Sequence, residues 1–351
     1  MGAALPAPML RFALAVLATT LTFAGARRLF APEADLFGAV ALVTGGSRGL
    51  GFLIARELAR EGCRLAICAR DADELERARL DLERRGAEVI AIRCDVADPA
   101  AVTKLVEETE RRLGPLDILV NNASIIQVAP VDALGVRDFQ DALAVNFWGT
   151  VHPTLAVLPG MRARRRGRIV NIASIGGKVS VPHLLPYGAA KFAVVGFSEG
   201  LAAELARDGI HVTTVVPGLM RTGSYLHAEF EGQAPAEFTW FALGSTLPGL
   251  SMDAERAARR IVRALKGREL EPILSLPAQI LARAHGLFPG AIIGTLALVN
   301  RLLPRAGAAA DRATGLELQR ASGAGALHVA TSLGRAAARR FHEYPPAPRS
   351  S

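Results

Sequence analysis

Cysteine is scarce in this chain, which has only three among its 351 residues. They are Cys63, Cys68 and Cys94, an odd number without regular spacing. This pattern argues against a disulfide framework and against a zinc site, so we predict no metal site. Cys68 and Cys94 lie in apolar runs typical of strands, and we expect them to be small core residues in a reducing compartment.

Lysine is also scarce, because only four of the 41 basic residues are lysines. The net charge of +8 and the isoelectric point near 10.1 would otherwise suit a nucleic-acid-binding protein. Since the remaining basic residues are arginines in an alanine-rich chain, we interpret the charge as compositional bias and expect no nucleic-acid partner. The densest basic run, 162–168, falls between an expected helix and an expected strand, as a solvated turn would. A membrane surface or an acidic partner stays open.

From Gly38 onward, short apolar runs alternate with amphipathic segments. The expected strands are 39–44, 64–69, 88–93, 116–120, 168–172 and 211–216. The expected helices are 50–61, 71–85, 99–113, 139–161 and 187–207. This alternation predicts βαβ units and an α/β fold, with a doubly wound parallel sheet covered by helices on both faces. Ligands bind such sheets beyond the carboxyl ends of the strands.

A glycine-rich turn follows the first expected strand: Thr44-Gly45-Gly46-Ser47-Arg48-Gly49-Leu50-Gly51. Glycines let the backbone turn tightly and approach a pyrophosphate, and the N-terminus of the next helix offers free N–H donors. A glycine-rich turn alone is weak evidence and can serve packing only. Its place at the first strand–helix junction favours a nucleotide site.

Two arginines lie where the cofactor ribose of such a site would be selected. The second strand ends in Ala69-Arg70, and Arg48 projects from the glycine turn toward the same region. Guanidinium groups suit a 2′-phosphate, which favours NADP(H). Asp71 follows at once and keeps NAD as the alternative, and surface arginines in an arginine-rich chain can also be incidental.

Polar residues follow the third and fourth strands, at the same edge of the sheet. Asp95 and Val96 come after the third strand and Asn121-Asn122-Ala123 after the fourth. We expect Asp95, Val96, Asn122 and Ala123 to contact the adenine half of the cofactor, although such residues are also ordinary turn formers.

A tyrosine and a lysine occur four residues apart, on one face of an expected helix, at Tyr187 and Lys191. A phenol is a poor acid or base at neutral pH, and a nearby ammonium lowers its pKa toward the useful range. Ser174 places a hydroxyl just past the fifth strand. With three tyrosines and four lysines in the chain, such a pair rarely arises by chance.

Together these motifs resemble the short-chain dehydrogenase/reductase family over about Gly38 to Lys266. The matching residues are Thr44, Gly45, Gly49, Gly51, Asn121, Asn122, Ala123, Asn146, Ser174, Tyr187, Lys191, Pro217 and Gly218. The resemblance implies one Rossmann-type domain with a seven-stranded parallel sheet, and usually a homo-oligomer. Ser124 departs from the pattern, because the family usually has glycine there.

The resemblance also assigns roles. It makes Tyr187 the acid/base, lets Lys191 bind the nicotinamide ribose and tune Tyr187, and has Ser174 polarise the substrate carbonyl. Asn146 would hold a water for proton relay, and Thr222, after Pro217-Gly218, would contact the nicotinamide carboxamide. The implied reaction is hydride transfer between a nicotinamide and a carbonyl or alcohol carbon.

The segment after Pro217-Gly218, about 219–250, corresponds to the substrate lid of the family. It carries the apolar residues Met220, Tyr225, Phe230, Phe238, Trp240, Phe241 and Leu243. An apolar substrate would account for them, and so would a lid that packs its own hydrophobic side chains. His183, shortly before Tyr187, is interpreted as a polar loop residue.

Both ends of the chain extend beyond this domain, which we place at 38–267. Segment 1–37 contains an apolar stretch, 12–26, too short for a simple spanning helix, which we interpret as an anchor, a cleaved signal or a packed helix. Segment 268–304 is apolar, interrupted by Pro289, and is expected to lie on a bilayer, cover the pocket or join a partner subunit. The remainder, 305–351, is expected to be a flexible or weakly helical tail. NADP(H) chemistry favours the cytoplasm, with the catalytic domain on that side of any membrane.

Three functions fit these observations. The first is an NADP(H)-dependent carbonyl–alcohol oxidoreductase acting on a lipophilic small molecule. The second is a 3-oxoacyl thioester reductase, whose basic surface would meet an acidic carrier protein. The third, of another class, is a membrane-associated nucleotide-binding scaffold protein.

Overall fold

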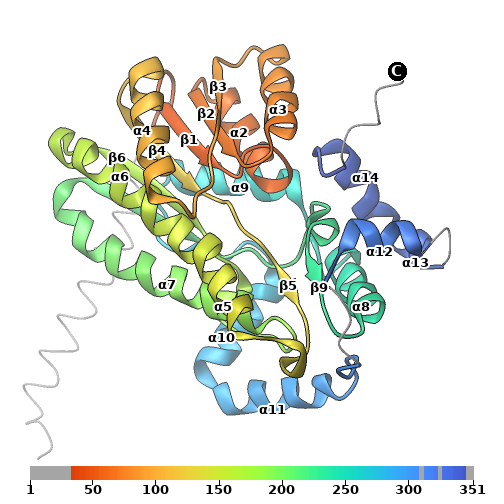
Figure 1. The fold of residues 1–351 in the computed structure, drawn as a ribbon. Coiled ribbons are helices and arrows are strands. Elements are labelled where there is room, and N and C mark those ends of the chain that lie inside the picture. The colour runs from red at the N-terminus through yellow and green to blue at the C-terminus, as the bar shows by residue number, and fades with distance from the viewer. Residues whose placement is uncertain (1–32, 308–311, 323–325, 345–351) are drawn as a thin grey trace, which may run out of the picture.

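A six-stranded parallel sheet forms the centre of the computed structural model, which describes residues 33–307, 312–322 and 326–344 (Figure 1). Each strand begins and ends within one residue of the range expected from the apolar runs. The strands, in spatial order, are β3 (Val89–Arg93), β2 (Arg64–Ala69), β1 (Val40–Thr44), β4 (Leu116–Asn121), β6 (Gly167–Ile172) and β7 (Ile210–Val215). The order reverses beside β1, so the β1 and β4 ends create the crevice that binds ligands in doubly wound sheets.

The sheet has six strands and not the seven that we expected. The segment that follows α9 (Ala254–Lys266) still reaches the position of a seventh strand. There Val216 pairs with Ile273 in an isolated parallel bridge. Thr214 N–H donates to Leu270 O at 2.7 Å and Val216 N–H donates to Pro272 O at 3.0 Å. Pro272 has no N–H to donate, and such a residue interrupts a ladder.

Helices cover both faces of the sheet, as the alternating side chains of its strands require. On one face, Ala41 and Val43 of β1 pack with helices α2, α3 and α9. On the other, Val40 and Leu42 pack with α4, α6 and residues of α7. The bounds of these helices are α2 (Gly49–Arg60), α3 (Ala72–Arg84), α4 (Pro99–Leu113), α6 (Gly149–Arg164), α7 (Leu185–Leu205) and α9 (Ala254–Lys266). Cys68 and Cys94 are buried, which confirms their expected place in the core, and Cys63 is buried as well.

The helix expected over 139–161 is divided in three. It begins as α5 (Val136–Ala142), continues as a π-helical stretch from Leu143 to Trp148, and ends as α6. A π-helical stretch inside an α-helix is rare and concentrates at functional sites. The interruption surrounds Asn146, which is fully buried.

A lid lies beside the crevice and is built from short elements. They are β8 (Met220–Arg221), β9 (Glu229–Phe230), α8 (Ala234–Thr246) and β10 (Met252–Asp253). Strand β9 lies between β5 (Gln127–Val128) and β11 (Ala313–Thr314) in a separate small sheet. Strand β9 of the lid therefore pairs with a strand from the C-terminal part of the chain, β11.

The C-terminal segments are largely helical. They form α10 (Leu276–Leu287), α11 (Pro289–Asn300), α12 (Gly315–Ala321), α13 (Ala326–Ala330) and α14 (Ser332–Arg340). Figure 1 shows α12, α13 and α14 beside the lid helix α8, whereas α10 and α11 form a hairpin at the opposite end of the lid. Among the described residues, no helix combines the length and apolar character needed to cross a membrane. Segment 1–32, with its expected apolar stretch, lies outside the described residues.

Candidate functional site

One cavity of about 780 Å³ lies beyond the carboxyl ends of the strands. It is lined by nearly all of the residues singled out in the sequence, from the glycine turn to Thr222. Among the residues that match the family motifs, Thr44, Asn121 and Asn146 do not line it and are buried. The fold therefore brings together residues that are more than 170 positions apart in the chain.

The glycine turn is held in place by the end of β4. Asn122 Nδ2 donates to the carbonyl oxygens of Thr44 and Gly45 at 3.1 and 3.2 Å. Thr44 Oγ1 accepts from the N–H groups of Asn122 and Ala123 at 2.9 and 3.1 Å. A Cβ on Gly51 would lie only 2.1 Å from Gly45 O, so the loop can close this tightly only with glycine there.

The N-terminus of α2 does not present all of its N–H groups to the cavity. Gly49 N–H donates to Phe341 O, which follows α14, at 2.8 Å. The Glu343 carboxylate lies beside it, because Oε1 would be 2.4 Å from a Cβ on Gly49. Our expectation of free N–H donors is corrected here, since the C-terminal tail takes one of them.

Sequence reasoning missed Glu343, which lines the cavity and is 3% exposed. Its carboxylate lies 3.2 Å from His227 Nε2 of the lid and 3.5 Å from Arg48 Nε. The available signal was the amphipathic pattern of α14 and its end, where Ala337, Ala338 and Phe341 are buried. That pattern predicts a packed helix and does not indicate which surface it covers.

Arg48 and Arg70, the two arginines proposed to select the cofactor, line the same cavity but have different surroundings. Arg48 forms hydrogen bonds with both carboxylate oxygens of Glu74, at 2.7 and 2.5 Å. Arg70 lines the cavity and forms no salt bridge among the described residues. Asp95 and Val96 line the same end, and Asp95 Oδ1 accepts from Ala97 N–H at 3.0 Å. Arg70 is therefore the arginine more available to an anionic ligand.

Tyr187 lies in the first turn of α7 and Lys191 one turn later, with Pro186 pre-setting the start of the helix. Lys191 Nζ donates to Ile172 O, at the end of β6, at 2.9 Å. It lies 5.7 Å from the centroid of the Tyr187 ring. The pair thus faces the cavity on one side of the helix, as the spacing predicts.

Burial controls the pKa values of both groups. It raises the pKa of Tyr187, partly offset by a hydrogen bond from Ser174, and lowers the pKa of Lys191 to about 8. We expected the ammonium to lower the pKa of the phenol, and in this structure the opposite direction holds. The reason is that desolvation outweighs the other causes, and Lys191 directs its Nζ at a backbone carbonyl.

Ser174 begins a short 3₁₀ turn immediately after β6. Its Oγ accepts from Gly176 N–H at 3.1 Å, and Ile175 N–H donates to Pro217 O, in the loop after β7, at 2.8 Å. Gly218 has no room for a Cβ, which would lie 2.5 Å from Ser275 Oγ. Thr222 is buried, and its Oγ1 accepts from Ser224 N–H at 3.1 Å.

Asn146 is held by the residues that follow the Asn-Asn-Ala motif. Its Oδ1 accepts from Ile125 N–H at 2.8 Å and from Ser124 Oγ at 2.9 Å. Its Nδ2 donates to Ile125 O at 3.1 Å. The serine that departs from the family pattern therefore adds a hydrogen bond to Asn146 that a glycine would not supply.

The apolar lid residues divide into two groups. Tyr225, Phe230 and Phe238 form a core with the tail residue Ala338, whereas Met220 and Trp240 line the cavity. The lid therefore packs some of its own hydrophobic side chains, as one interpretation expects, and turns others toward the cavity. The α10 residues Pro277, Ala278 and Leu281 complete the apolar wall opposite.

His183 is a loop residue, but it is buried and does not line the cavity. Its Nδ1 lies 2.9 Å from both carboxylate oxygens of Glu237, in α8, and its backbone has a positive φ of 66°. Trp240 Nε1 donates to the same carboxylate at 2.7 Å. This cluster fixes the lid helix to the loop that precedes Tyr187.

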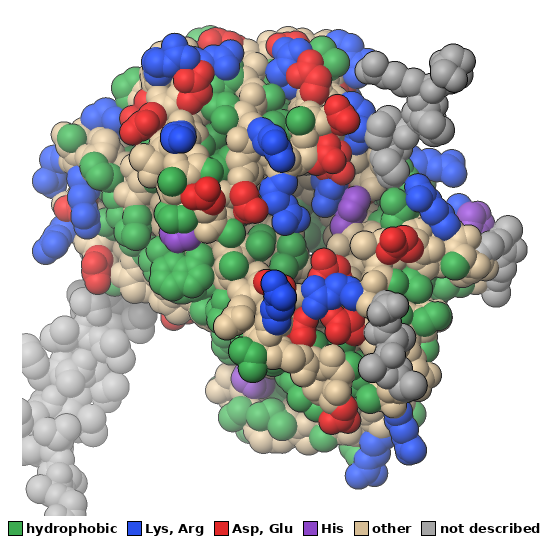
Figure 2. Space-filling model, viewed as in Figure 1, with side chains coloured by type: hydrophobic (Ala, Val, Ile, Leu, Met, Phe, Trp, Pro, Cys, Tyr) green, Lys and Arg blue, Asp and Glu red, His purple; other side chains and the backbone are tan. Residues whose placement is uncertain are grey.

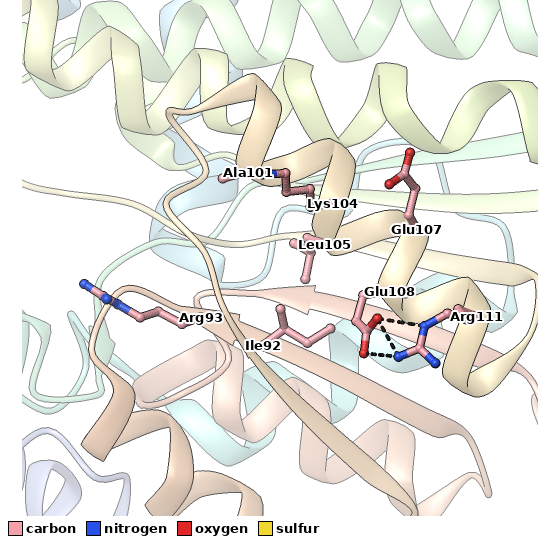
Figure 3. A pocket seen from close by; sticks show the side chains of 8 residues that line it. All are labelled: Ile92, Arg93, Ala101, Lys104, Leu105, Glu107, Glu108 and Arg111. Atoms are coloured by element: carbon pink, nitrogen blue, oxygen red, sulfur yellow. Dashed lines mark hydrogen bonds and ion pairs between the residues drawn. The ribbon is translucent and has the colours of Figure 1, made fainter.

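A second hollow lies between β3 and α4 (Figure 3). Glu108 and Arg111 on its wall pair with each other at 2.7 Å, as the dashed lines show. It contains none of the residues predicted from the sequence, so we place the functional site in the larger cavity.

A family model described as short chain dehydrogenase matches residues 39–229, more than half of the chain. A relative from Streptomyces violaceoruber, named as a ketoacyl reductase of granaticin polyketide synthase, is 43% identical over 185 residues, covering 52% of this chain and 68% of the relative.

Solved structures agree with this match. A short-chain dehydrogenase from Streptomyces avermitilis has a TM-score of 0.64 and 31% identity, covering 75% of this chain and 97% of its own. A variant of actinorhodin polyketide ketoreductase with NADPH has a TM-score of 0.59 and 32% identity, covering 67% and 95%. The chain therefore belongs to the short-chain dehydrogenase family, whose members are oxidoreductases of alcohol and carbonyl groups.

Proposed function

We propose that this enzyme uses NADP(H) to interconvert a carbonyl and an alcohol on an apolar substrate. The observation that carries the proposal is the single cavity that joins Arg70 and the glycine turn to Tyr187, Lys191 and the apolar lid wall. A small-molecule substrate would reach Tyr187 between the lid and α10.

The residues around the cavity fit a dinucleotide. The glycine turn borders the cavity, where Phe341 O already accepts from the Gly49 N–H, and the cavity extends from Arg70 and Asp95 to Lys191. When bound, NADPH supplies a hydride from nicotinamide C4. Thr44, Gly45, Ser47, Gly49, Leu50, Gly51, Asn122, Ala123, Pro217, Gly218 and Thr222 would hold it, together with Val96 near the adenine.

In the reductive direction, Tyr187 gives its phenolic proton to the carbonyl oxygen that becomes the alcohol oxygen. The raised pKa of Tyr187 keeps it protonated at neutral pH, which suits a proton donor. Ser174 donates a hydrogen bond to the same oxygen, and the Lys191 ammonium stabilises the phenolate left behind. Asn146, whose buried amide contacts Ile125, would position a water behind Lys191 to restore the proton.

NADP(H) is favoured over NAD by two arginines and by a structural relative solved with NADPH. Glu74, which pairs with Arg48, and the nearby Asp71 support NAD as the alternative. The test compares kcat/KM for NADPH and NADH in the unmodified enzyme and in Arg70→Ala. We expect Arg70→Ala to lower the NADPH value about tenfold and leave NADH unchanged, and Arg112→Ala on α4 to change neither. Equal or better rates with NADH in the unmodified enzyme would refute the preference.

The experiment for the whole proposal is an NADPH-oxidation screen over ketones, aldehydes, steroids and acyl thioesters. Tyr187→Phe is expected to abolish turnover with every substrate found. Tyr225→Phe is the matched control, because Tyr225 is buried in the lid and its hydroxyl has no partner among the described residues. Turnover that survives Tyr187→Phe would rule out the proposed acid/base.

A 3-oxoacyl thioester is the second candidate substrate, favoured by the 43% identity to the ketoacyl reductase. Activity on a carrier-bound 3-oxoacyl group that falls with salt, and exceeds activity on simple ketones, would support it. Equal activity on the free ketones would favour the first candidate.

We further propose a homo-oligomer, the usual state of the family. Exposed apolar side chains on α7, on α6 and just before α6 support a subunit contact: Phe192, Leu155 and Trp148 are 40%, 55% and 48% exposed. Sedimentation of the enzyme and of Leu155→Asp tests it, since a monomer in both would contradict it.

A further inference from the structure

Helix α11 is apolar and uncovered. Its twelve residues, Pro289–Asn300, include no charged side chain, and none of them is buried by the part of the chain that the structure describes. Ile293 and Leu298 are 59% and 58% exposed. A helix that is hydrophobic on all sides is normally buried in a core or in a membrane, so α11 lacks a partner.

The uncovered surface continues onto α10 and both ends of α11. Leu276, Ile280, Leu287, Phe288 and Leu302 are each at least 60% exposed. We call these five residues, with Ile293 and Leu298, the apolar hairpin face. Exposed apolar side chains gathered on one helical hairpin mark a site of interaction with a protein or a membrane.

The charged residues of the segment that carries this face have one sign. Between Glu271 and Asp311 the sequence contains no acidic residue, and Arg283, Arg301 and Arg305 are exposed there. Figure 2 shows hydrophobic side chains at the lower end of the molecule, where Figure 1 places α11, with basic side chains and one acidic patch nearby. Apolar side chains flanked by arginines match the acyl chains and anionic headgroups of a phospholipid surface.

The length of α11 determines how it can meet a bilayer. Twelve residues extend about 18 Å, whereas the hydrocarbon core is about 30 Å thick. The helix can lie in the interface and cannot span it. A symmetric contact with a second copy would bring the same arginines of two subunits together, which disfavours that occupant.

We propose that the apolar hairpin face docks on the surface of a bilayer that contains anionic phospholipids, with α11 embedded among the headgroups and upper acyl chains. Helix α10 then separates the bilayer from the cavity, because Ala278 and Leu281 line the cavity and Leu276 and Ile280 face outward. An apolar substrate would enter beside the membrane surface. This last consequence rests on the proposed function, and the docking itself does not.

A fluorophore on α11 tests the docking in the full chain, independently of any contribution from segment 1–32. The three native cysteines are buried, so Leu298→Cys can be labelled selectively with an environment-sensitive dye. With vesicles of phosphatidylcholine and phosphatidylglycerol we expect a blue shift and quenching by spin-labelled lipid. Leu80→Cys on α3, at the opposite end of the molecule in Figure 1, should show neither.

Two further measurements complete the test. Ile293→Asp with Leu298→Asp should weaken vesicle binding about tenfold without altering NADPH turnover in solution, and 0.5 M salt should weaken binding of the unmodified chain. An unchanged Leu298 label with bound vesicles would overturn the proposal, since another segment would then hold the membrane. So would a blue shift without vesicles that grows with protein concentration, which would indicate a second copy. If the unmodified enzyme shows no NADPH turnover with any substrate, the proposed function is refuted and the docking result still stands.

Discussion

Helices α11 and α14 both follow the catalytic domain. The more charged of the two is partly buried, and the more apolar one is exposed. Helix α14 carries Arg335, Arg339 and Arg340, yet Ala337 and Ala338 are buried. Helix α11 carries no charge and buries nothing among the described residues. Hydrophobicity therefore does not decide burial by itself, because a helix also needs a surface that fits it.

The surface that fits α14 is made of small residues. A Cβ on Gly223 would lie 2.5 Å from Ala338 Cβ, and one on Gly334 would lie 2.3 Å from Thr246 Cγ2. Such close packing carries Phe341 O and the Glu343 carboxylate to the glycine turn. The helix with fewer apolar residues thus reaches the candidate site, and the more apolar helix stays outside.

The largest difference that we expect is in the unfolding free energy lost when one aspartate is placed on each helix. Ala338→Asp would bury a charge without a partner and should cost about 4 kcal/mol of unfolding free energy, or detach the tail. Ile293→Asp on exposed α11 should change it by less than about 0.5 kcal/mol. Urea denaturation followed by tryptophan fluorescence measures both. Equal losses would show that α11 is packed as tightly as α14.

Truncating the side chain that ends the tail should have a somewhat smaller effect. Phe341 is 1% exposed, so Phe341→Ala should cost about 3 kcal/mol, whereas Leu302→Ala should be nearly neutral at 86% exposure. Hydrogen exchange at the Gly49 amide should also accelerate, because Phe341 O is its acceptor. Unchanged exchange in Phe341→Ala would mean that the tail does not depend on this contact.

The pH dependence of kcat/KM distinguishes the end of the cavity that holds Tyr187 and Lys191 from the end that the C-terminal tail contacts. Burial lowers the pKa of Lys191 to about 8, so its ammonium is lost as pH rises through that value. Tyr187 stays protonated, because burial raises its pKa. We expect NADPH-dependent kcat/KM to fall about tenfold from pH 7 to pH 9, equally in the unmodified enzyme and in Glu343→Gln. A flat profile to pH 9.5 would contradict the role of Lys191.

The smallest effect concerns cofactor affinity. Removing the Glu343 charge beside the N-terminus of α2 should favour a bound pyrophosphate, by about 1 kcal/mol or fivefold in Kd for NADPH, while Arg48 keeps its pairing with Glu74. Fluorescence titration measures Kd, with the exposed α7 substitution Glu204→Gln as the control. Weaker binding in Glu343→Gln would show that the carboxylate instead organises the site.

Much of the sheet follows from local pattern. The alternation of buried side chains in β1, with Ala41 and Val43 on one face and Leu42 on the other, is a property of any strand covered on both sides. The glycine turn and the Tyr187–Lys191 pair are local as well, because turn geometry and helix periodicity act over a few residues. These features were predictable to within a residue or two.

The departures arise where distant parts of the chain meet. The seventh strand is reduced to one bridge, at Val216, because a proline meets the ladder there. The long helix opens into a π-helical stretch at Asn146, whose amide is held by Ser124 and Ile125 from another segment. Neither Asn146 nor its neighbours carry a local signal for this, since the segment that holds the Asn146 side chain lies more than 20 residues away.

Periodicity and motif spacing are therefore sufficient for the doubly wound sheet, its binding edge and the residues gathered there, because each depends on short-range geometry. Three features depended on the assembled fold: the sign of the pKa shift at Tyr187, the tail across Gly49, and the choice of which C-terminal helix is covered. Burial sets the first, and surface complementarity between segments about 300 residues apart sets the second. The difference in burial between the two C-terminal helices arises because α14 packs closely against small residues of the lid, whereas α11 has no such surface among the described residues.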